Sequence, residues 1–233
     1  MKKFTIAALI SISLFSLQAT AQQEVNETLY RKKSTRTAQT RLEPMINMAA
    51  TSFRYTGNDK VLSDYGHSVK GLRAGLSFQA GITPSFSLVS DLYYLRKGGK
   101  LDAGNPLTTD ASTIRLNTVE LPVLARIHFG KFYVNAGPSV GYIIDGKQKI
   151  NDLSVKLLFN NSATGYKRFE AGVQAGAGFY LPFKNKTLGL DLRYAHGLTQ
   201  ISKDIKMYNR ALMISVHFSK AWKRNPLAKN KSL

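Results

Sequence analysis

Apolar and polar residues alternate along most of the chain, in successive runs that are separated by turns. In the clearest run, Leu72, Ala74, Leu76, Phe78, Ala80 and Ile82 alternate with Arg73, Gly75, Ser77, Gln79 and Gly81. A repeat of two residues is typical of a β-strand that has one apolar face and one polar face. The pattern therefore predicts a protein built from strands.

Eight runs of this kind can be placed along the sequence. They cover residues 45–55, 72–82, 86–97, 113–128, 132–145, 169–181, 188–194 and 211–218. The first is the weakest, because its alternation loses phase near Thr51 and Ser52. Pro122 and Pro138 fall inside the fourth and fifth runs, where we expect a local bulge or a missing ladder hydrogen bond, since proline has no N–H to donate.

The connections between these runs alternate in length. Short turns follow the second, fourth and sixth runs, and longer loops follow the first, third, fifth and seventh. The loop after the third run opens with Lys97-Gly98-Gly99-Lys100 and reaches about residue 112, and the loop after the fifth covers about residues 146–166. Aromatic residues gather at the run ends: Tyr93, Tyr94, Tyr142, Phe169 and Tyr208 toward the loops, and Phe86, Phe129, Phe132, Phe179 and Phe183 toward the turns. An even number of strands with short periplasmic turns, long outer loops and two aromatic girdles is typical of an outer-membrane barrel. Both chain ends would then lie in the periplasm.

A soluble, lipocalin-like barrel shows the same period with its apolar face turned inward. Periodicity alone does not separate the two alternatives. The polar face is rich in glycine, which suits a crowded interior, and the apolar face carries almost no charge. These features favour an all-β fold, an eight-stranded antiparallel up-and-down transmembrane β-barrel.

The first residues have the three parts of a secretory signal peptide. The chain begins Met-Lys-Lys, continues with an apolar stretch over residues 4–17, and has small residues at Ala19 and Ala21. The apolar stretch is shorter than the about 20 residues of a spanning helix. We therefore expect a signal peptide over residues 1–21, a basic periplasmic leader over 22–41, a barrel over 42–219 and a basic periplasmic tail over 220–233. The barrel would be integral to the outer membrane.

The chain is strongly basic, with a formal net charge of +19, and contains no cysteine. The absence of cysteine excludes a lipid-anchored lipoprotein, disulfides and thiolate metal sites. Export and the lack of a groove-reading helix argue against nucleic acid. We expect outer-membrane lipid to surround the protein. The basic tails either dock onto a periplasmic or envelope protein or anionic lipid, or serve as solubilising segments without a dedicated partner.

Seven charged residues fall on the face that we expect to line the lumen: Arg73, Asp91, Glu120, Arg126, Glu170, Asp191 and Arg193. Isolated buried charges cost several kcal/mol each, so these side chains should pair. They would form either a closed ion-pair plug or a selectivity-lining network. Eight strands enclose a space just wide enough for side chains, which favours the plug.

The sequence offers little for catalysis or for cofactor binding. Its four histidines lack the spacing of a metal site, and no cofactor motif is present. Asp64, His67 and Ser68 fall together in the first outer loop, where a rim-sited enzyme is an alternative to ordinary loop polarity. We expect no metal, no cofactor and no enzymatic activity.

Five segments together resemble the outer-membrane β-barrel domain family of porin-like and PorT-like proteins. They are SLVSDLYYLRKG (87–98), LNTVELPVL (116–124), FYVNAGPSVG (132–141), FEAGVQAGAG (169–178) and LDLRYAHGL (190–198). The resemblance implies an eight-stranded barrel with an acidic and arginine-bearing interior, and it implies no reaction. PorT-like members of the family are associated with a secretion apparatus. This chain departs from the pattern by continuing past the terminal aromatic Phe218 to Leu233.

Together these observations predict a monomeric, non-enzymatic barrel with a filled lumen. We expect it to act as a membrane anchor or as an assembly- or secretion-associated component. The alternative is a narrow porin-like channel for small solutes.

Overall fold

The computed structural model of the chain describes residues 40–160, 163–183 and 186–219. The predicted signal peptide, the predicted tail and all of the predicted leader except Thr40 and Arg41 lie outside these residues. The described elements are β1 (Arg41–Tyr55), the 3₁₀ helix η1 (Gly57–Tyr65), β2 (Gly66–His67), β3 (Val69–Gly81), β4 (Phe86–Leu101), β5 (Ser112–Phe129), β6 (Phe132–Ile150), β7 (Leu153–Lys156), β8 (Phe169–Phe183), β9 (Lys186–Gly197) and β10 (Met207–Ser219). Within the described part, no helix is long and apolar enough to cross a membrane.

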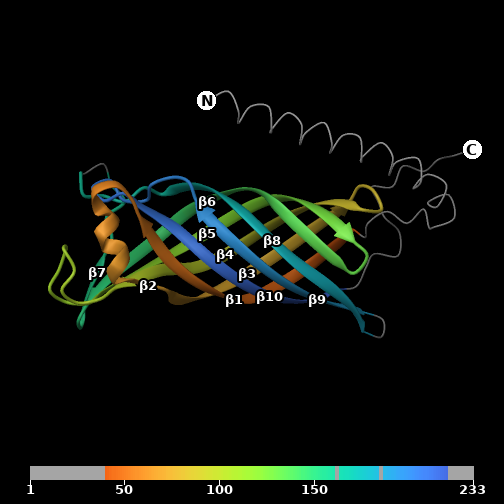
Figure 1. Cartoon of the computed structure of the whole chain (residues 1–233), viewed down its shortest axis with the longest axis horizontal. Coiled ribbons are helices and arrows are strands. Elements are labelled where there is room, and N and C mark those ends of the chain that lie inside the picture. The colour runs from red at the N-terminus through yellow and green to blue at the C-terminus, as the bar shows by residue number, and fades with distance from the viewer. Residues whose placement is uncertain (1–39, 161–162, 184–185, 220–233) are drawn as a thin grey trace, which may run out of the picture. The chain divides into compact units, whose positions relative to one another are not determined.

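Eight of these strands close into one antiparallel barrel, which confirms the predicted fold (Figure 1). Each strand pairs with the next barrel strand in the chain, and β10 returns to β1 with Met48 opposite Ile214. The two short strands extend this sheet at the loop end, because β2 pairs with β4 and β7 pairs with β6. The first and last barrel residues, Arg41 and Ser219, both lie at the end where the short turns are.

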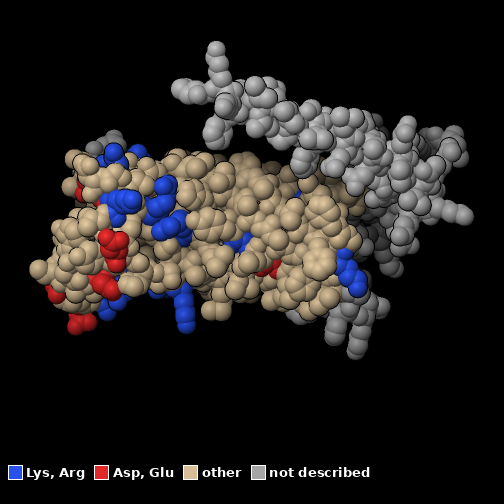
Figure 2. Space-filling model, viewed as in Figure 1, with Lys and Arg blue, Asp and Glu red and all other residues tan. Residues whose placement is uncertain are grey.

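The apolar face of each strand points outward and the polar face points into the lumen. Ile46 is 75% exposed and Ile214 61%, whereas Arg73 is fully buried. The lipocalin-like alternative is therefore wrong, because it requires the reverse arrangement. Uncharged side chains cover the middle of the wall in Figure 2, as expected of a barrel whose outer surface faces hydrocarbon.

The alternation along β1 is unbroken, so the predicted loss of phase near Thr51 and Ser52 is wrong. Thr51, Phe53 and Tyr55 all continue the inward face. The inner residues simply change from polar to aromatic there, because the loop end of the lumen holds an apolar cluster. That cluster, which we call the loop-side cluster, consists of Phe53, Tyr55, Leu62, Leu101, Ile114, Leu116, Ile143, Ile201 and Met207.

The two prolines interrupt the ladder as predicted, but neither produces a bulge. Pro122 pairs with β6 and Pro138 pairs with β8. Each has no ladder partner on its other side, toward β4 and β5 respectively. The register shift between β5 and β6 falls at Asn117 and Thr118 instead.

Two further expectations need correction at the loop ends. The strands are longer than predicted, since β4 reaches Leu101 and β6 reaches Ile150, so Lys97 lies in a strand and not in a loop. Tyr93 does not belong to the aromatic girdle, because its side chain is 1% exposed and points into the lumen. Tyr94 beside it is 39% exposed on the outer wall, as expected.

Candidate functional site

The structure buries all seven predicted charged residues inside the barrel, on β3, β4, β5, β8 and β9. They lie in three connected groups along the lumen, which we call the lumen network. Their strands place them there because each occupies an inward position of the two-residue repeat. Charges taken out of water this completely require partners, and the contacts show how each is matched.

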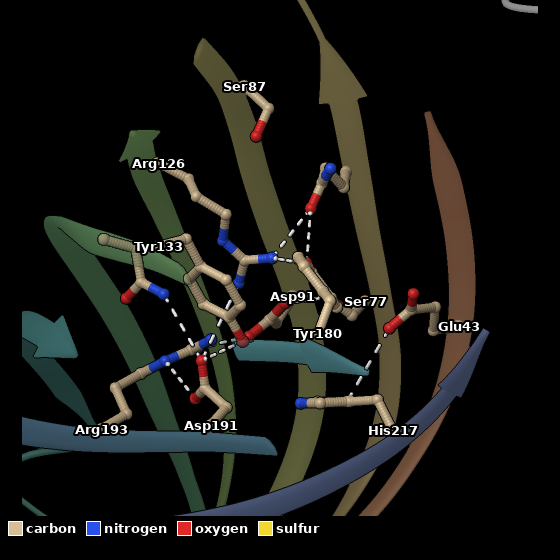
Figure 3. Close-up of polar contacts among 12 residues, drawn as sticks. Glu43, Ser77, Ser87, Asp91, Arg126, Tyr133, Tyr180, Asp191, Arg193 and His217 are labelled. Carbon is tan, nitrogen blue, oxygen red and sulfur yellow. Dashed lines mark hydrogen bonds and ion pairs between the residues drawn. The ribbon is translucent and has the colours of Figure 1, made fainter. Parts of the chain in front are cut away.

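The central group is formed by the Asp91 carboxylate and the guanidinium groups of Arg73 and Arg193. Figure 3 shows Asp91 and Arg193. Asp91 Oδ2 accepts a hydrogen bond from Arg73 Nη2 at 2.7 Å and another from Arg193 Nη1 at 2.5 Å. Its second oxygen accepts a hydrogen bond from Ser77 Oγ at 2.6 Å. The guanidinium of Arg73 also stacks on Tyr93, 3.8 Å from the ring centroid. Asp91 therefore balances two cations from opposite sides of the lumen.

The turn-side group is built around Arg126. Its Nη1 donates to Gln79 Oε1 at 2.8 Å and to the Tyr180 hydroxyl at 2.7 Å. Its Nη2 lies 3.9 Å from Asp191 Oδ2, and its guanidinium lies 4.0 Å from the centre of the Tyr133 ring. Asp191 joins this group to the central one, because its other oxygen lies 3.5 Å from Arg193 Nε.

The loop-side group contains one lysine between two glutamates. Lys97 Nζ donates to Glu120 Oε1 at 2.6 Å and to Glu170 Oε2 at 2.5 Å. Glu120 also accepts a hydrogen bond from the Tyr93 hydroxyl at 2.7 Å, and Glu170 accepts one from Asn209 Nδ2 at 2.8 Å. Through Tyr93 this group contacts Arg73, so polar contacts run along most of the lumen.

Sequence reasoning missed three members of the network: Lys97, Arg41 and Glu43. Lys97 was assigned to a loop because two glycines follow it, and Arg41 to the basic leader, which is wrong. Arg41 lies at the start of β1, with its guanidinium 4.5 Å from the Tyr180 ring centre and 3.8 Å from Glu43. Continued alternation upstream of Met45 was the signal that could have found both β1 residues.

With these three residues the charges in the lumen balance. The described part of the chain buries five Lys and Arg side chains (Arg41, Arg73, Lys97, Arg126 and Arg193) and five Asp and Glu side chains (Glu43, Asp91, Glu120, Glu170 and Asp191). His217 adds one titratable group, 3.8 Å from Glu43. A neutral, internally paired set is what a low-dielectric interior without counter-ions requires.

Above the network, the loop-side cluster fills the outer end of the barrel. Leu62 of η1 is 2% exposed, and Ile201 of the last loop is fully buried. Tyr166 packs against the same cluster, where burial and the nearby Asp204 carboxylate raise its pKa to about 12. The loops thus fold into the mouth of the barrel and close it with apolar side chains.

A small cavity lies beside the loop-side group. The cavity beside Lys97, Glu120 and Glu170 has a volume of about 20 Å³. A cavity of that size has room for about one water molecule. Beside these three side chains the lumen therefore leaves room for little more than one water molecule.

At the rim, the histidine of the predicted Asp64, His67 and Ser68 group contacts a carboxylate from the next loop. His67 Nε2 lies 2.6 Å from Asp102 Oδ2, and both side chains are exposed. Lys100 Nζ is 3.0 Å from the other oxygen of Asp102. Among the described residues, no group of three His, Cys, Asp or Glu side chains is placed to hold a metal ion.

Solved structures similar to this chain are small outer-membrane barrels. The Ail attachment invasion locus protein of Yersinia pestis is 11% identical, with a TM-score of 0.43, and the match covers 78% of this chain and 99% of that one. Neisserial surface protein A is 10% identical with the same score, covering 78% and 97%. OprG from Pseudomonas aeruginosa is 12% identical with a TM-score of 0.40, covering 80% and 97%.

No curated protein matches the sequence. The family described as outer membrane protein beta-barrel domain matches residues 21–203. That span includes seven of the eight barrel strands.

Proposed function

Because the chain belongs to the family of outer membrane protein beta-barrel domains, we propose that it is a monomeric, non-enzymatic barrel that anchors or helps to assemble other envelope proteins. It sits in the outer membrane with its lumen closed. A secretion-associated role, which the resemblance to PorT-like proteins implies, is one form of this function. Its surroundings are outer-membrane lipid, and no cofactor takes part.

The observation that carries this proposal is the filled lumen. A charge-balanced network occupies the turn-side and central parts, and the loop-side cluster closes the outer mouth. A diffusion channel needs a continuous water-filled path, and eight strands leave room for one only if the inward side chains are small. Here the inward positions carry arginines, tyrosines and a lysine that contact one another across the lumen.

What the protein presents to partners then lies at its two ends. The outer loops include η1 and β7, and the first and last barrel residues, Arg41 and Ser219, lie at the turn end. Residues 22–40 and 220–233 continue from those ends and carry many lysines and arginines. With the turns in the periplasm, these basic segments would meet periplasmic or inner-membrane partners that have acidic surfaces.

The experiment is a gentle detergent purification from native outer membranes, which compares the full chain with a variant that lacks residues 22–40 and ends at Ser219. We expect a second protein to co-purify with the full chain at a fixed molar ratio and to be absent from the preparation of the trimmed variant. Planar-bilayer recordings on both proteins should show no conductance. A barrel that purifies alone in both forms and conducts small ions would overturn the proposal in favour of a narrow channel.

A further inference from the structure

Cations on the outer wall of the barrel gather near its loop end. Outward-facing Arg54, Lys70, Arg96, Arg115 and Arg210 follow the apolar part of their strands on the loop side. Figure 2 shows such a group where the loop ends of β1 and β10 lie side by side. Among the described side chains, the outward strand positions toward the turns are apolar, for example Phe78, Ile127 and Val216.

A hollow of about 260 Å³ lies within this basic region, over β1. Its lining includes Ala50, Ser52, Ser68, Tyr194, Arg210 and Leu212. The two small β1 residues form the floor, because Ala50 pairs with Leu212 on one side and with Lys70 on the other. Ser52 pairs with Arg210. Arg210, two serine hydroxyl groups, a tyrosine and a leucine therefore line the hollow, and Lys70 lies on the neighbouring strand opposite Ala50.

These cations lack acidic partners. Within the described residues, no carboxylate forms a salt bridge with Arg54, Lys70 or Arg210; the surface ion pairs involve Lys100 and Lys149 instead. Arg54 stacks on Tyr208 at 4.7 Å, and Arg210 Nη2 donates to the Phe53 carbonyl at 3.2 Å.

The neighbouring strands add further positive charge. Arg115 reaches back across Gly98, and its Nη1 donates to the Lys70 carbonyl at 2.5 Å. Outward Arg96 lies on β4, the strand between β3 and β5. Such a group, without compensating carboxylates, attracts a polyanionic headgroup.

We propose that this hollow binds the phosphorylated headgroup of a lipid in the outer leaflet. The wall directly on the turn side of it consists of Met48 (62% exposed), Leu72 (52%) and Ile214 (61%), which would contact the acyl chains of the same molecule. Guanidinium and ammonium groups at the membrane interface favour phosphate, and arginine binds it through paired N–H donors. A soluble anion would gain the charge contacts but not the apolar wall.

The test measures lipid retention by the full-length barrel in dodecylmaltoside, with native mass spectrometry. Dioleoyl phosphatidic acid carries a phosphomonoester, and dioleoyl phosphatidylglycerol carries a phosphodiester with the same chains. One molecule of phosphatidic acid should bind to each barrel, and it should bind more tightly than phosphatidylglycerol does. Removing one cation should weaken the binding of phosphatidic acid about fivefold. Arg210→Gln should therefore bind this lipid about fivefold more weakly than the unaltered protein. The double variant Lys70→Gln with Arg210→Gln should bind it about fivefold more weakly than Arg210→Gln alone.

A second variant tests shape independently of charge. Ser52→Trp fills the hollow and should abolish the preference for phosphatidic acid, while Lys131→Gln, an exposed lysine in the β5–β6 turn, should change nothing. Heat-modifiable migration on gels verifies that each variant is folded. Equal binding of both lipids that is insensitive to Arg210→Gln, or displacement of the lipid by millimolar inorganic phosphate, would overturn the proposal. Neither result bears on whether the lumen conducts.

Discussion

Asp91→Asn should be the most destabilising isosteric change in the lumen. Among the described residues, Asp91 supplies the one carboxylate within salt-bridge distance of Arg73, whose ion pair is 2.7 Å long. Arg193 would keep a second carboxylate, Asp191, at 3.5 Å. The substitution therefore leaves the fully buried guanidinium of Arg73 without a carboxylate partner. Breaking a buried ion pair in this way costs about 3–5 kcal/mol.

The converse change, Arg73→Met, should cost less. Asp91 keeps Arg193 and the Ser77 hydroxyl as partners, so its charge remains compensated. Methionine loses the contact of the guanidinium with the Tyr93 ring but fills similar space. Combining Arg73→Met with Asp91→Asn should recover most of the stability lost by Asp91→Asn, because removing both charges of a buried pair is often nearly neutral.

The assay is equilibrium urea unfolding of the barrel in lipid vesicles, followed by far-UV circular dichroism and heat-modifiable migration. Asp145→Asn on the exposed outer wall is the matched control, and its effect should stay within about 0.5 kcal/mol. If Asp91→Asn were no more destabilising than Asp145→Asn, Asp91 would not be holding two buried cations, and the lumen would have to contain water or ions that neutralise them.

Three further changes test other parts of the structure. Gly178→Ala should destabilise the barrel by about 1–3 kcal/mol, because the new methyl group overlaps the backbone of β9 and the inward ring of Tyr133. The free energy is measured by urea unfolding, with Ala177→Gly on the lipid-facing side as the control. Leu62→Ala should increase trypsin cleavage within η1 without altering heat-modifiable migration of the barrel, since the loop-side cluster loses a side chain that is 2% exposed; unchanged cleavage would mean that the cluster does not hold the loop. The pKa of Asp102 is held below its ordinary value by Lys100 and His67, so its carboxyl should stay ionised to lower pH in an NMR titration, and Lys100→Gln should raise the midpoint; an unchanged midpoint would contradict the assigned contact.

The two-residue repeat was sufficient to predict which residues face the lumen. Once the apolar face is assigned to lipid, every position along a regular strand is assigned as well, which is why Arg73, Asp91 and the five other charged residues were found. The pairing among them was not predictable. Arg193 and Asp91 are 102 residues apart and meet across the barrel, and that meeting depends on the register and stagger of all the intervening strands.

Glycine explains why Lys97 was missed. Gly98 and Gly99 indicate a loop when their conformational freedom is considered alone. In the structure both lie in β4 and are needed for close packing. A Cβ atom on Gly99 would lie 2.6 Å from the Phe53 ring, and one on Gly98 would collide with the backbone of β5. Only the fold reveals that these glycines make room for neighbours and do not form a turn.

The two closures of the lumen differ in kind, and this difference bears on function. The lumen network is polar, and each of its members depends on partners from other strands, so a change there affects the stability of the whole barrel. The loop-side cluster depends on η1 and on the loops, which can rearrange while the strand ladder stays intact. A partner that displaced the loops would therefore expose the apolar mouth but would still meet the network beneath it. If the protein is the anchor that we propose, a partner could therefore bind the outer loops without opening a leak through the membrane.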